Sequence, residues 1–511
     1  MRKIRLFCTL FILLAAFAAG GYCAEEAVEK DAGTGPAVVG AERTVTEAVL
    51  EDIEVLSLED CVVFALNNSF DVQVAKLDLR VAETDILYSQ AVFDTIVFGS
   101  AGYDENKFQQ ASVFSPDDSQ TNVYSAGISK KLITGTEIEA GYSDTRSWSN
   151  SSFVSKNPAH ESVYRIEATQ PVGKNFFGYV DRGNLTLTRL AVKNADLGTK
   201  DSIESSIADV ETAYWSLVYA RAVSDISEEM LKKARVLHES NQRNFDIGLV
   251  EKAELLASQA NLIMRKTGVL LARNDYRSAE EELKLVMNLR EEVLFVPGDR
   301  LEVQAPEAGL AANLEEAFEK RRDYAVGKRD VEIRKLDLKI KNNEKWPEID
   351  LKASFAANGL DPKLEQAFRT MSSGENSEMY AGVEFSWPIE NSAARSQAKR
   401  AAFEKEKAIV LLKKTERSII TEVGNAVRDV ETYYTRAGNT AETACLQAEK
   451  LAEEEKRFRH GRSSTKNLID YQQDLLNAEM DRARALLDLA LARIALERTK
   501  NSMLEKYEEM L

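Results

Sequence analysis

Side chains that could carry out catalysis or bind a metal are few and scattered in this sequence of 511 residues. It contains four Cys and three His, His160, His238 and His460, and none has a neighbour at the spacing of a zinc site or a Cys/His catalytic pair. We find no nucleophile with a base and no cofactor motif, so we predict no enzyme, no metal site and no cofactor. Acidic residues outnumber basic ones, 83 to 66, which argues against nucleic-acid binding.

The N-terminal region has the pattern of an export signal. Basic residues at the start precede an apolar run, Leu6 to Phe17, that is too short to cross a bilayer as a helix. Small residues follow, and cleavage after Gly20 or after Cys23 fits the small-x-small rule, with a lipidated Cys23 left open. We predict a signal peptide over residues 1–24 and a leader rich in Glu, Gly and Ala over 25–56.

The rest of the chain contains one order of patterns twice. In each copy a helical opening leads through β-like stretches to a Pro, followed by a long helical pattern and a break that contains Gly. Pro171 and Gly248 are separated by nearly the same number of residues as Pro388 and Gly461, which chance rarely produces. The predicted parts are a first repeat (57–290), a linker (291–312) and a second repeat (313–511).

The helical patterns predict rods that fold back on themselves. About 65 residues at 1.5 Å rise make a rod of roughly 100 Å, longer than a compact domain needs. After each Gly, small and apolar residues alternate in steps of three and four, as in a coiled-coil seam. The second copy has Leu468, Tyr471, Leu475, Ala478, Arg482, Ala485, Leu489, Ala492, Leu496 and Thr499, and the first has Ala253, Leu256, Ala260, Ile263 and Leu270. An ordinary antiparallel coiled coil would show the same pattern.

Polar and apolar residues alternate with period two at 136–142 and 164–169, which lie within six β-like stretches. They cover residues 93–103, 122–132, 136–147, 164–172, 348–356 and 382–389. No later stretch reaches the ~18 apolar residues of a membrane helix. Two-faced strands in an exported chain favour a transmembrane β-barrel, which several chains would have to share in order to close it. The alternative is a β-subdomain that caps a helical rod.

The order of these patterns resembles the TolC-type outer-membrane efflux protein family. The most specific match is Phe458 to Gln472, and Phe245 to Ala260 and Trp387 to Asn391 are similar to family segments. The resemblance covers roughly residues 57–505. It implies a mostly α fold with β: a homotrimer in which each copy gives four strands to a 12-stranded barrel, continued by a 12-helix tunnel through the periplasm. The stretches at 122–132 and 136–147 are additional, and we expect them to form an extracellular hairpin extension with Gly135 in its turn.

The same resemblance implies that the chain would be the gated exit duct of a tripartite efflux or type I secretion system. It would reside in the cell outer membrane, in contact with its lipid, and extend into the periplasm. Its partners would be a periplasmic membrane-fusion adaptor and an inner-membrane transporter. The alternative from a different class is a periplasmic coiled-coil structural or adaptor protein without a pore.

The resemblance also implies which residues form the pore constriction. Asp470 corresponds to a family aspartate of the constriction, and Asn467 stands where the family often has a second one. In some relatives a basic residue and a Tyr lock the closed hairpin. Ser463 stands at the position of the basic residue and Phe458 at that of the Tyr, and Arg462 is a possible substitute for the basic residue. Residues of the type found at 463–467 also cap helices, and the helix dipole alone would favour an acid at 470.

The two turns are where the family's adaptor docks. The docking residues implied are Gly248, Leu249, Val250, Gly461, Arg462, Ser463 and Ser464. Plain helix–helix turns would look the same. The charged run Glu453 to Arg457 is expected to be a solvated helix face.

Overall fold

The computed structural model describes residues 55–110, 115–290 and 309–508, together with 293, 295–303 and 305. The predicted signal peptide and all but the last two residues of the predicted leader lie outside the described residues. The described chain divides into two compact units. The sheet unit consists of residues 83–191 and 331–407, and the hairpin unit consists of the remaining described residues.

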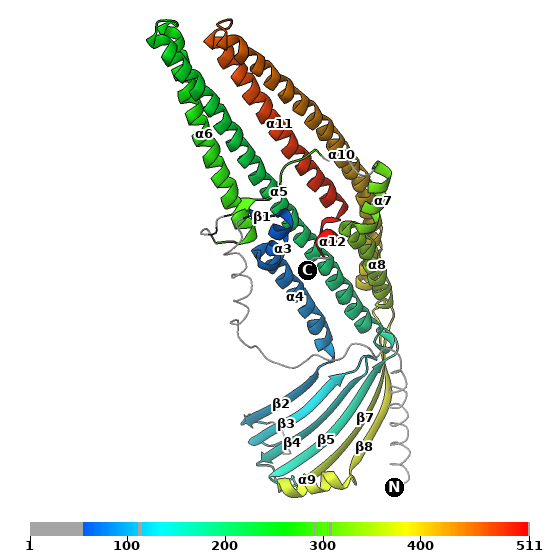
Figure 1. Cartoon of the computed structure of the whole chain (residues 1–511). Helices are drawn as coiled ribbons and strands as arrows, with labels where there is room; N and C mark the ends of the chain where they lie inside the picture. Colours follow the sequence, from blue (N-terminus) through cyan, green and yellow to red (C-terminus); the bar gives the residue numbers. More distant parts are fainter. Residues whose placement is uncertain are drawn as a thin grey trace. The chain divides into compact units, whose positions relative to one another are not determined.

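The sheet unit contains one antiparallel sheet with the strand order β2-β3-β4-β5-β7-β8 (Figure 1). Its strands are β2 (Thr95–Asn106), β3 (Ser119–Lys131), β4 (Glu137–Ser149), β5 (Ala159–Pro171), β7 (Glu348–Asp361) and β8 (Ser377–Ser386). Each overlaps one of the six β-like stretches, so those predictions of strand are confirmed. Because alternate side chains point to opposite faces, this sheet has one mainly polar face and one mainly apolar face.

Helix α9 (Leu364–Ser373) connects β7 to β8 and packs on the apolar face near the end of the strands (Figure 1). Gly359 of β7 permits this contact, since a Cβ there would lie 1.9 Å from the carbonyl oxygen of Ala367. The ring of Phe368 meets Tyr142 of β4 edge-on, with 5.9 Å between the centroids. The helix therefore covers β4, β5 and β7 at that end.

The structure corrects the expectation that β3 and β4 form an extension separate from the other strands. Both strands pair along their length with each other and with β2 and β5, so they lie in the middle of the sheet. Gly135 does occupy their turn, with φ +74°, as predicted. The sheet thus has six strands per chain, two more than the resemblance implies. Alternation identified the strands, but it carries no information on which strands become neighbours.

Two helical hairpins of equal dimensions confirm the duplicated plan. The long helices α5 (Tyr179–Asp246) and α10 (Ser392–Arg459) have 68 residues each, and the returning helices α6 (Lys252–Met287) and α11 (Thr465–Lys500) have 36 each. The shorter elements are α3 (Leu58–Asn68), α4 (Phe70–Gln90), α7 (Leu310–Lys320), α8 (Arg322–Asn343), α12 (Met503–Glu508), η1 (Ala91–Phe93), η2 (Phe176–Gly178), β1 (Val55–Leu56) and β6 (Val296–Pro297). Across the described part of the chain, no helix combines the length and the apolar character needed to cross a bilayer.

The predicted seam is correct in the second hairpin and wrong in the first. On α11 the buried residues include Leu468, Leu475, Ala478, Ala485, Leu489 and Ala492. On α6, however, Leu256, Ile263 and Leu270 are exposed, and the buried face contains Ser258, Asn261, Arg265, Val269 and Ala272. The apolar stripe of α6 is therefore not its contact with the rest of its own chain.

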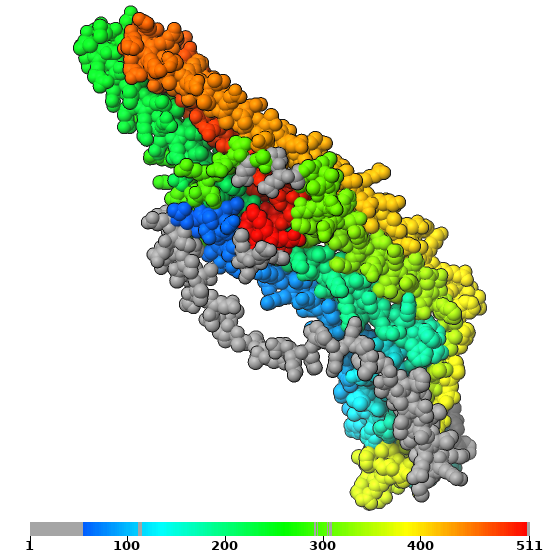
Figure 2. All heavy atoms as spheres, turned by 45° about the vertical axis from the view of Figure 1, so that its right-hand side comes forward, coloured from blue at the N-terminus to red at the C-terminus, as the bar shows by residue number. Residues whose placement is uncertain are grey.

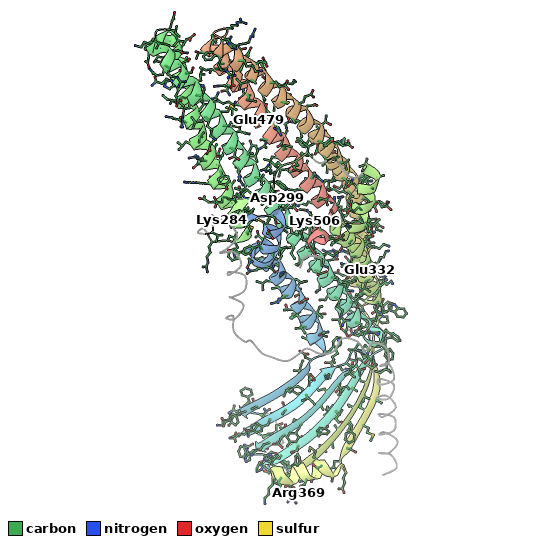
Figure 3. All side chains as sticks on the ribbon, in the orientation of Figure 1. Lys284, Asp299, Glu332, Arg369, Glu479 and Lys506 are labelled. Atoms are coloured by element: carbon green, nitrogen blue, oxygen red, sulfur yellow. The ribbon has the colours of Figure 1, made fainter. Side chains whose placement is uncertain are left out.

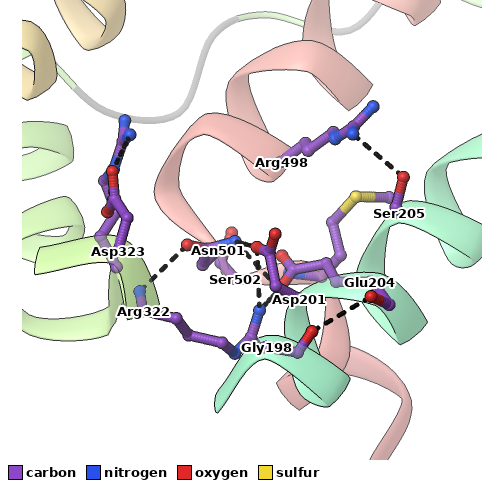
Figure 4. Close-up of polar contacts among 12 residues, drawn as sticks. Gly198, Asp201, Glu204, Ser205, Arg322, Asp323, Arg498, Asn501 and Ser502 are labelled. Carbon is purple, nitrogen blue, oxygen red and sulfur yellow. Dashed lines mark hydrogen bonds and ion pairs between the residues drawn. The ribbon is translucent and has the colours of Figure 1, made fainter. Parts of the chain in front are cut away.

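A buried polar cluster joins the end of α11 to α5 and α8 (Figure 4). Glu204 of α5 is fully buried and is paired with Arg322. Its carboxylate also accepts hydrogen bonds from the Met503 backbone N–H at 3.0 Å and the Asn501 side chain at 3.3 Å. Asn501 ends α11 with φ +57°, and Asn288 ends α6 with φ +56°. These paired left-handed Asn residues are a further trace of the duplication.

The predicted leader and linker meet in the hairpin unit. Val55 and Leu56 form β1, which pairs in parallel with β6 of the linker. Asp299, labelled in Figure 3, accepts hydrogen bonds from the hydroxyl of buried Tyr214 at 2.7 Å and from the Leu58 backbone N–H at 2.9 Å. These contacts attach the linker to α5 and to the first turn of α3.

Candidate gate at the hairpin tips

Both hairpins turn in the same way. Gly248 and Gly461 adopt left-handed conformations, with φ +75° and +70°. Each donates its N–H to the carbonyl three residues earlier at 2.9 Å, and the next residue donates to the carbonyl five residues before it. This pair of bonds is the Schellman motif, which satisfies carbonyl groups at a helix end and favours Gly. The predicted role of Gly at each turn is confirmed.

The returning helix α11 begins at a capping serine. The Ser464 hydroxyl accepts a hydrogen bond from the Asn467 backbone N–H at 3.3 Å. This is the capping role that residue types alone suggested for this stretch. This hydrogen bond involves only the backbone of Asn467, and the Asn467 side chain stays exposed.

Asp470 and Asn467 lie on one exposed face of α11. They are three residues apart, so their side chains are neighbours on the helix. Leu468 and Gln472, on the opposite face, are buried. A single chain therefore presents the carboxylate and the amide together, without covering either.

Ser463 and Phe458 have contacts within their own chain. The Ser463 hydroxyl donates to the Glu454 carboxylate at 2.5 Å, and Glu454 is buried although it belongs to the charged run expected to be solvated. Phe458 packs against the cluster formed by Met230, Leu237, Leu451, Leu468 and Leu475. The structure places neither beside Asp470 on the exposed face. Arg462 is exposed.

A series of hydrogen-bonded polar side chains, most of them buried, connects the two hairpins below their tips. Asn241 of α5 donates its side-chain N–H to the Thr465 hydroxyl at 3.0 Å, and Thr465 donates to Glu254 of α6 at 3.2 Å. Further along, the side-chain N–H of Asn261 donates to the side-chain oxygen of Gln472 at 3.5 Å. In the space-filling view the tip of the first hairpin, in green, lies against the tip of the second, in orange (Figure 2). These contacts were not predicted, although polar residues at helical spacing on α6 were the signal.

Arg265 of α6 is buried in the same region. Its side chain is 6% exposed, and its Nε and Nη2 atoms have no hydrogen-bond partner among the described residues. Burial lowers the pKa of this guanidinium, because the charged form loses its water. Arg265 lies at a pocket of 290 Å³ with Met230, Met264 and Met480.

The turn of the first hairpin exposes apolar side chains. Ile247 and Leu249 are 70% and 72% exposed, and Val250 is half-buried. The turn of the second hairpin is polar instead, with exposed Arg462 and Ser464. No cluster of metal-binding side chains occurs in the part of the chain that the structure describes.

The chain belongs to the outer membrane efflux protein family, which matches residues 136–289 and 313–501. Its place is the cell outer membrane, from which it extends into the periplasm. No curated protein matches the sequence. The membership supports an efflux channel of the TolC type over an enzyme.

Solved channels share the fold at low sequence identity. The CmeC outer membrane channel of Campylobacter jejuni is 15% identical, with a TM-score of 0.63, and the match covers 87% of this chain and 85% of that one. The open state of the MtrE outer membrane channel of Neisseria gonorrhoeae is also 15% identical, with a TM-score of 0.64 and coverage of 88% and 89%. VceC of Vibrio cholerae is 13% identical, with a TM-score of 0.64 and coverage of 87% and 95%.

Proposed function

We propose that three copies of this chain form a channel-tunnel, the exit duct of a tripartite efflux or type I secretion system, gated at its periplasmic tips. The observation that carries the proposal is the open sheet. Its outermost strands, β2 and β8, each pair on one side only among the described residues. An unpaired backbone N–H or C=O in hydrocarbon costs several kcal/mol, so a sheet in the outer membrane must close with other copies.

Exposed apolar residues on the rods support the same assembly. Leu256, Ile263 and Leu270 of α6 recur every seven residues and are between 53% and 70% exposed. Val410 and Ile420 of α10 are also exposed. Because a stripe with this period suits packing along a second helix, we assign it to the neighbouring copy.

The exposed Asp470 and Asn467 of α11 support a gate. Three copies would place three Asp470 carboxylates and three Asn467 amides around one axis. A ring of carboxylates in a narrow passage attracts cations and repels anions, and the amides add hydrogen bonds without charge. Ser463 and Phe458 would hold the turn of this hairpin in place through Glu454 and the buried cluster.

The tips would receive the partner proteins. The exposed residues of the first turn, Ile247 and Leu249, suit the apolar stripe of a helical hairpin from a periplasmic adaptor. Gly461, Arg462 and Ser464 would supply the polar part of the same contact. The adaptor would in turn connect the duct to an inner-membrane transporter.

Extraction and mass measurement test this function. A trimeric channel should stay in the outer-membrane fraction, need detergent for release and give a native mass of three mature chains. A periplasmic coiled-coil protein would be released without detergent as a single copy. That result would overturn the proposed function.

A further inference from the structure

The six-stranded sheet changes the size of the barrel that three copies can close. The hairpin β3–β4 is inserted between β2 and β5, the position at which the resemblance implies direct neighbours. β3 pairs with β2 from Ser119 to Lys130 and with β4 along its whole length. The hairpin therefore spans the same height as the other strands.

The inserted strands share the two faces of the sheet. One row of paired residues crosses all six strands and is apolar throughout: Val97, Ile128, Ala140, Ile166, Phe355 and Met379. The adjacent row on the other face is polar on the four inner strands, with Ser129, Glu139, Glu167 and Ser354, and ends in Ile96 on β2 and Tyr380 on β8. A hairpin standing in water outside the membrane would need no apolar face in register with its neighbours. These rows are the pattern of strands with lipid on one side and a polar lumen on the other.

The turn of the hairpin is fixed to the base of the sheet. A Cβ on Gly135 would lie 2.8 Å from the backbone nitrogen of Gly178 and 3.2 Å from Pro171. The Thr136 hydroxyl donates to Gln170 at 2.5 Å, and Gln170 donates to the Thr134 carbonyl at 3.1 Å. The turn therefore docks on the joint between β5 and α5, which holds both inserted strands in the sheet.

An inserted hairpin also leaves the edges compatible. Neighbouring strands of this sheet are antiparallel, so β2 and β8 run in opposite directions. β8 of one copy can then pair with β2 of the next in the same antiparallel alternation. Two added strands preserve this alternation, whereas one would break it.

We infer that three copies close an eighteen-stranded barrel, with β3 and β4 of every copy as membrane-spanning strands. This inference rests on the proposed trimeric channel. With a strand spacing of about 4.8 Å and a tilt of about 40°, eighteen strands give a backbone radius of about 18 Å, compared with about 12 Å for twelve. Barrels of sixteen to eighteen strands enclose an open aqueous channel. The outer end of the duct is thus wide and polar, suited to large hydrated cargo, and the tip becomes the narrow point.

Cysteine scanning of the full-length protein in proteoliposomes tests the position of the hairpin. In a C445S background, S129C on the polar face should react with a small membrane-impermeant maleimide through the lumen. I128C, on the apolar face, should lose that reaction and react with a lipid-soluble maleimide instead. S354C and F355C of β7 lie in the same two rows and are the matched controls.

The controls separate this inference from the proposed function. If I128C reacts with the impermeant reagent while F355C is protected, the hairpin lies outside the membrane and the inference is wrong, although the channel stands. If S354C and F355C also react alike with the two maleimides, β7 does not separate lipid from a polar lumen, and the proposed barrel is wrong. In end-on views, electron cryomicroscopy should show eighteen strands with threefold symmetry. A particle of two copies with twelve strands would contradict both the proposed trimer and the eighteen-stranded barrel.

Discussion

The Asn241 side chain donates a hydrogen bond to the Thr465 hydroxyl at 3.0 Å, and both residues are buried. Asn241 belongs to the first hairpin and Thr465 to the first turn of α11 in the second. Since Thr465 also donates to Glu254, one residue connects α11 to both helices of the first hairpin. Any outward movement of the second hairpin must break these bonds. We therefore expect them to be among the contacts within one chain that favour the closed state of the proposed gate.

Thr465→Val should loosen the tip. The substitution keeps the shape of the side chain but removes the nearer of the two acceptors of the buried Asn241 amide, leaving only the Glu254 carbonyl oxygen at 3.4 Å, at a cost of about 1–3 kcal/mol. We expect faster hydrogen exchange at residues 241–254 and a larger open fraction in single-channel records. Thr443→Val is the control, because the Thr443 hydroxyl bonds only to a carbonyl of its own helix. Equal exchange in both variants would contradict the role of Thr465.

Arg265→Met should stabilise the protein. It removes a buried charge with two nitrogen atoms that have no hydrogen-bond partner among the described residues. Such replacements by apolar residues of similar volume are often neutral or stabilising by about 1–4 kcal/mol. The measurement is the urea midpoint of unfolding of the detergent-solubilised protein. Arg273→Met is the matched control on the same helix, where an exposed pair with Glu228 at 2.7 Å contributes about 0–1 kcal/mol. A large loss of stability in Arg265→Met would show that the guanidinium has a partner.

Cys61 should remain an unreactive thiol, and it should not pair with Cys445. Cys61 is buried, and burial together with the nearby carboxylates of Asp60 and Asp299 raises the pKa of its thiol to about 12. Because the thiolate is the reactive form, maleimide labelling of Cys61 should stay low from pH 7 to pH 9. Cys445 is exposed and free in a single chain. Labelling after unfolding in urea gives the full signal of both thiols, and a Cys61–Cys445 disulfide would contradict the expectation.

Much of this architecture could be predicted from the sequence, and the errors have physical causes. Period-two alternation identified β3 and β4, but whether a strand is a neighbour of β2 depends on long-range pairing that no local pattern contains. Leu256 and Ile263 fit a heptad seam. The face of α6 that is buried within its own chain, however, contains Asn261 and Arg265. In a protein that assembles from copies, the best apolar stripe can serve the contact with the next copy. Periodicity cannot distinguish the two.

The role of the tip residues in a gate stays a prediction. The exposure of Asp470 and Asn467 is compatible with a lumen, but their role needs the other copies and stays a prediction. The buried polar contacts of Asn241 and Thr465 were missed because isolated Asn and Thr residues are usually exposed, and only their partners show that they are not. The turns were predictable, since Gly248 and Gly461 carry a local signal that needs no partner.

Asn467→Asp should strengthen the constriction. It would add a second ring of three carboxylates next to Asp470, so the ratio of cation to anion permeability in planar bilayers should rise. Asn439→Asp is the control, since it adds the same charge on an exposed position of α10 away from the tip. If both variants raise the ratio equally, the effect belongs to the charge of the whole tunnel and not to the tip.

The central claim is that the second hairpins of three copies converge on one passage. The most direct test is the current through Asp470→Ala in a planar bilayer, compared with the unsubstituted protein. We predict that both conduct, and that the variant loses cation preference and block by multivalent cations, because three carboxylates leave the narrowest point. Unchanged selectivity and block would contradict this, since Asp470 would then lie away from the passage.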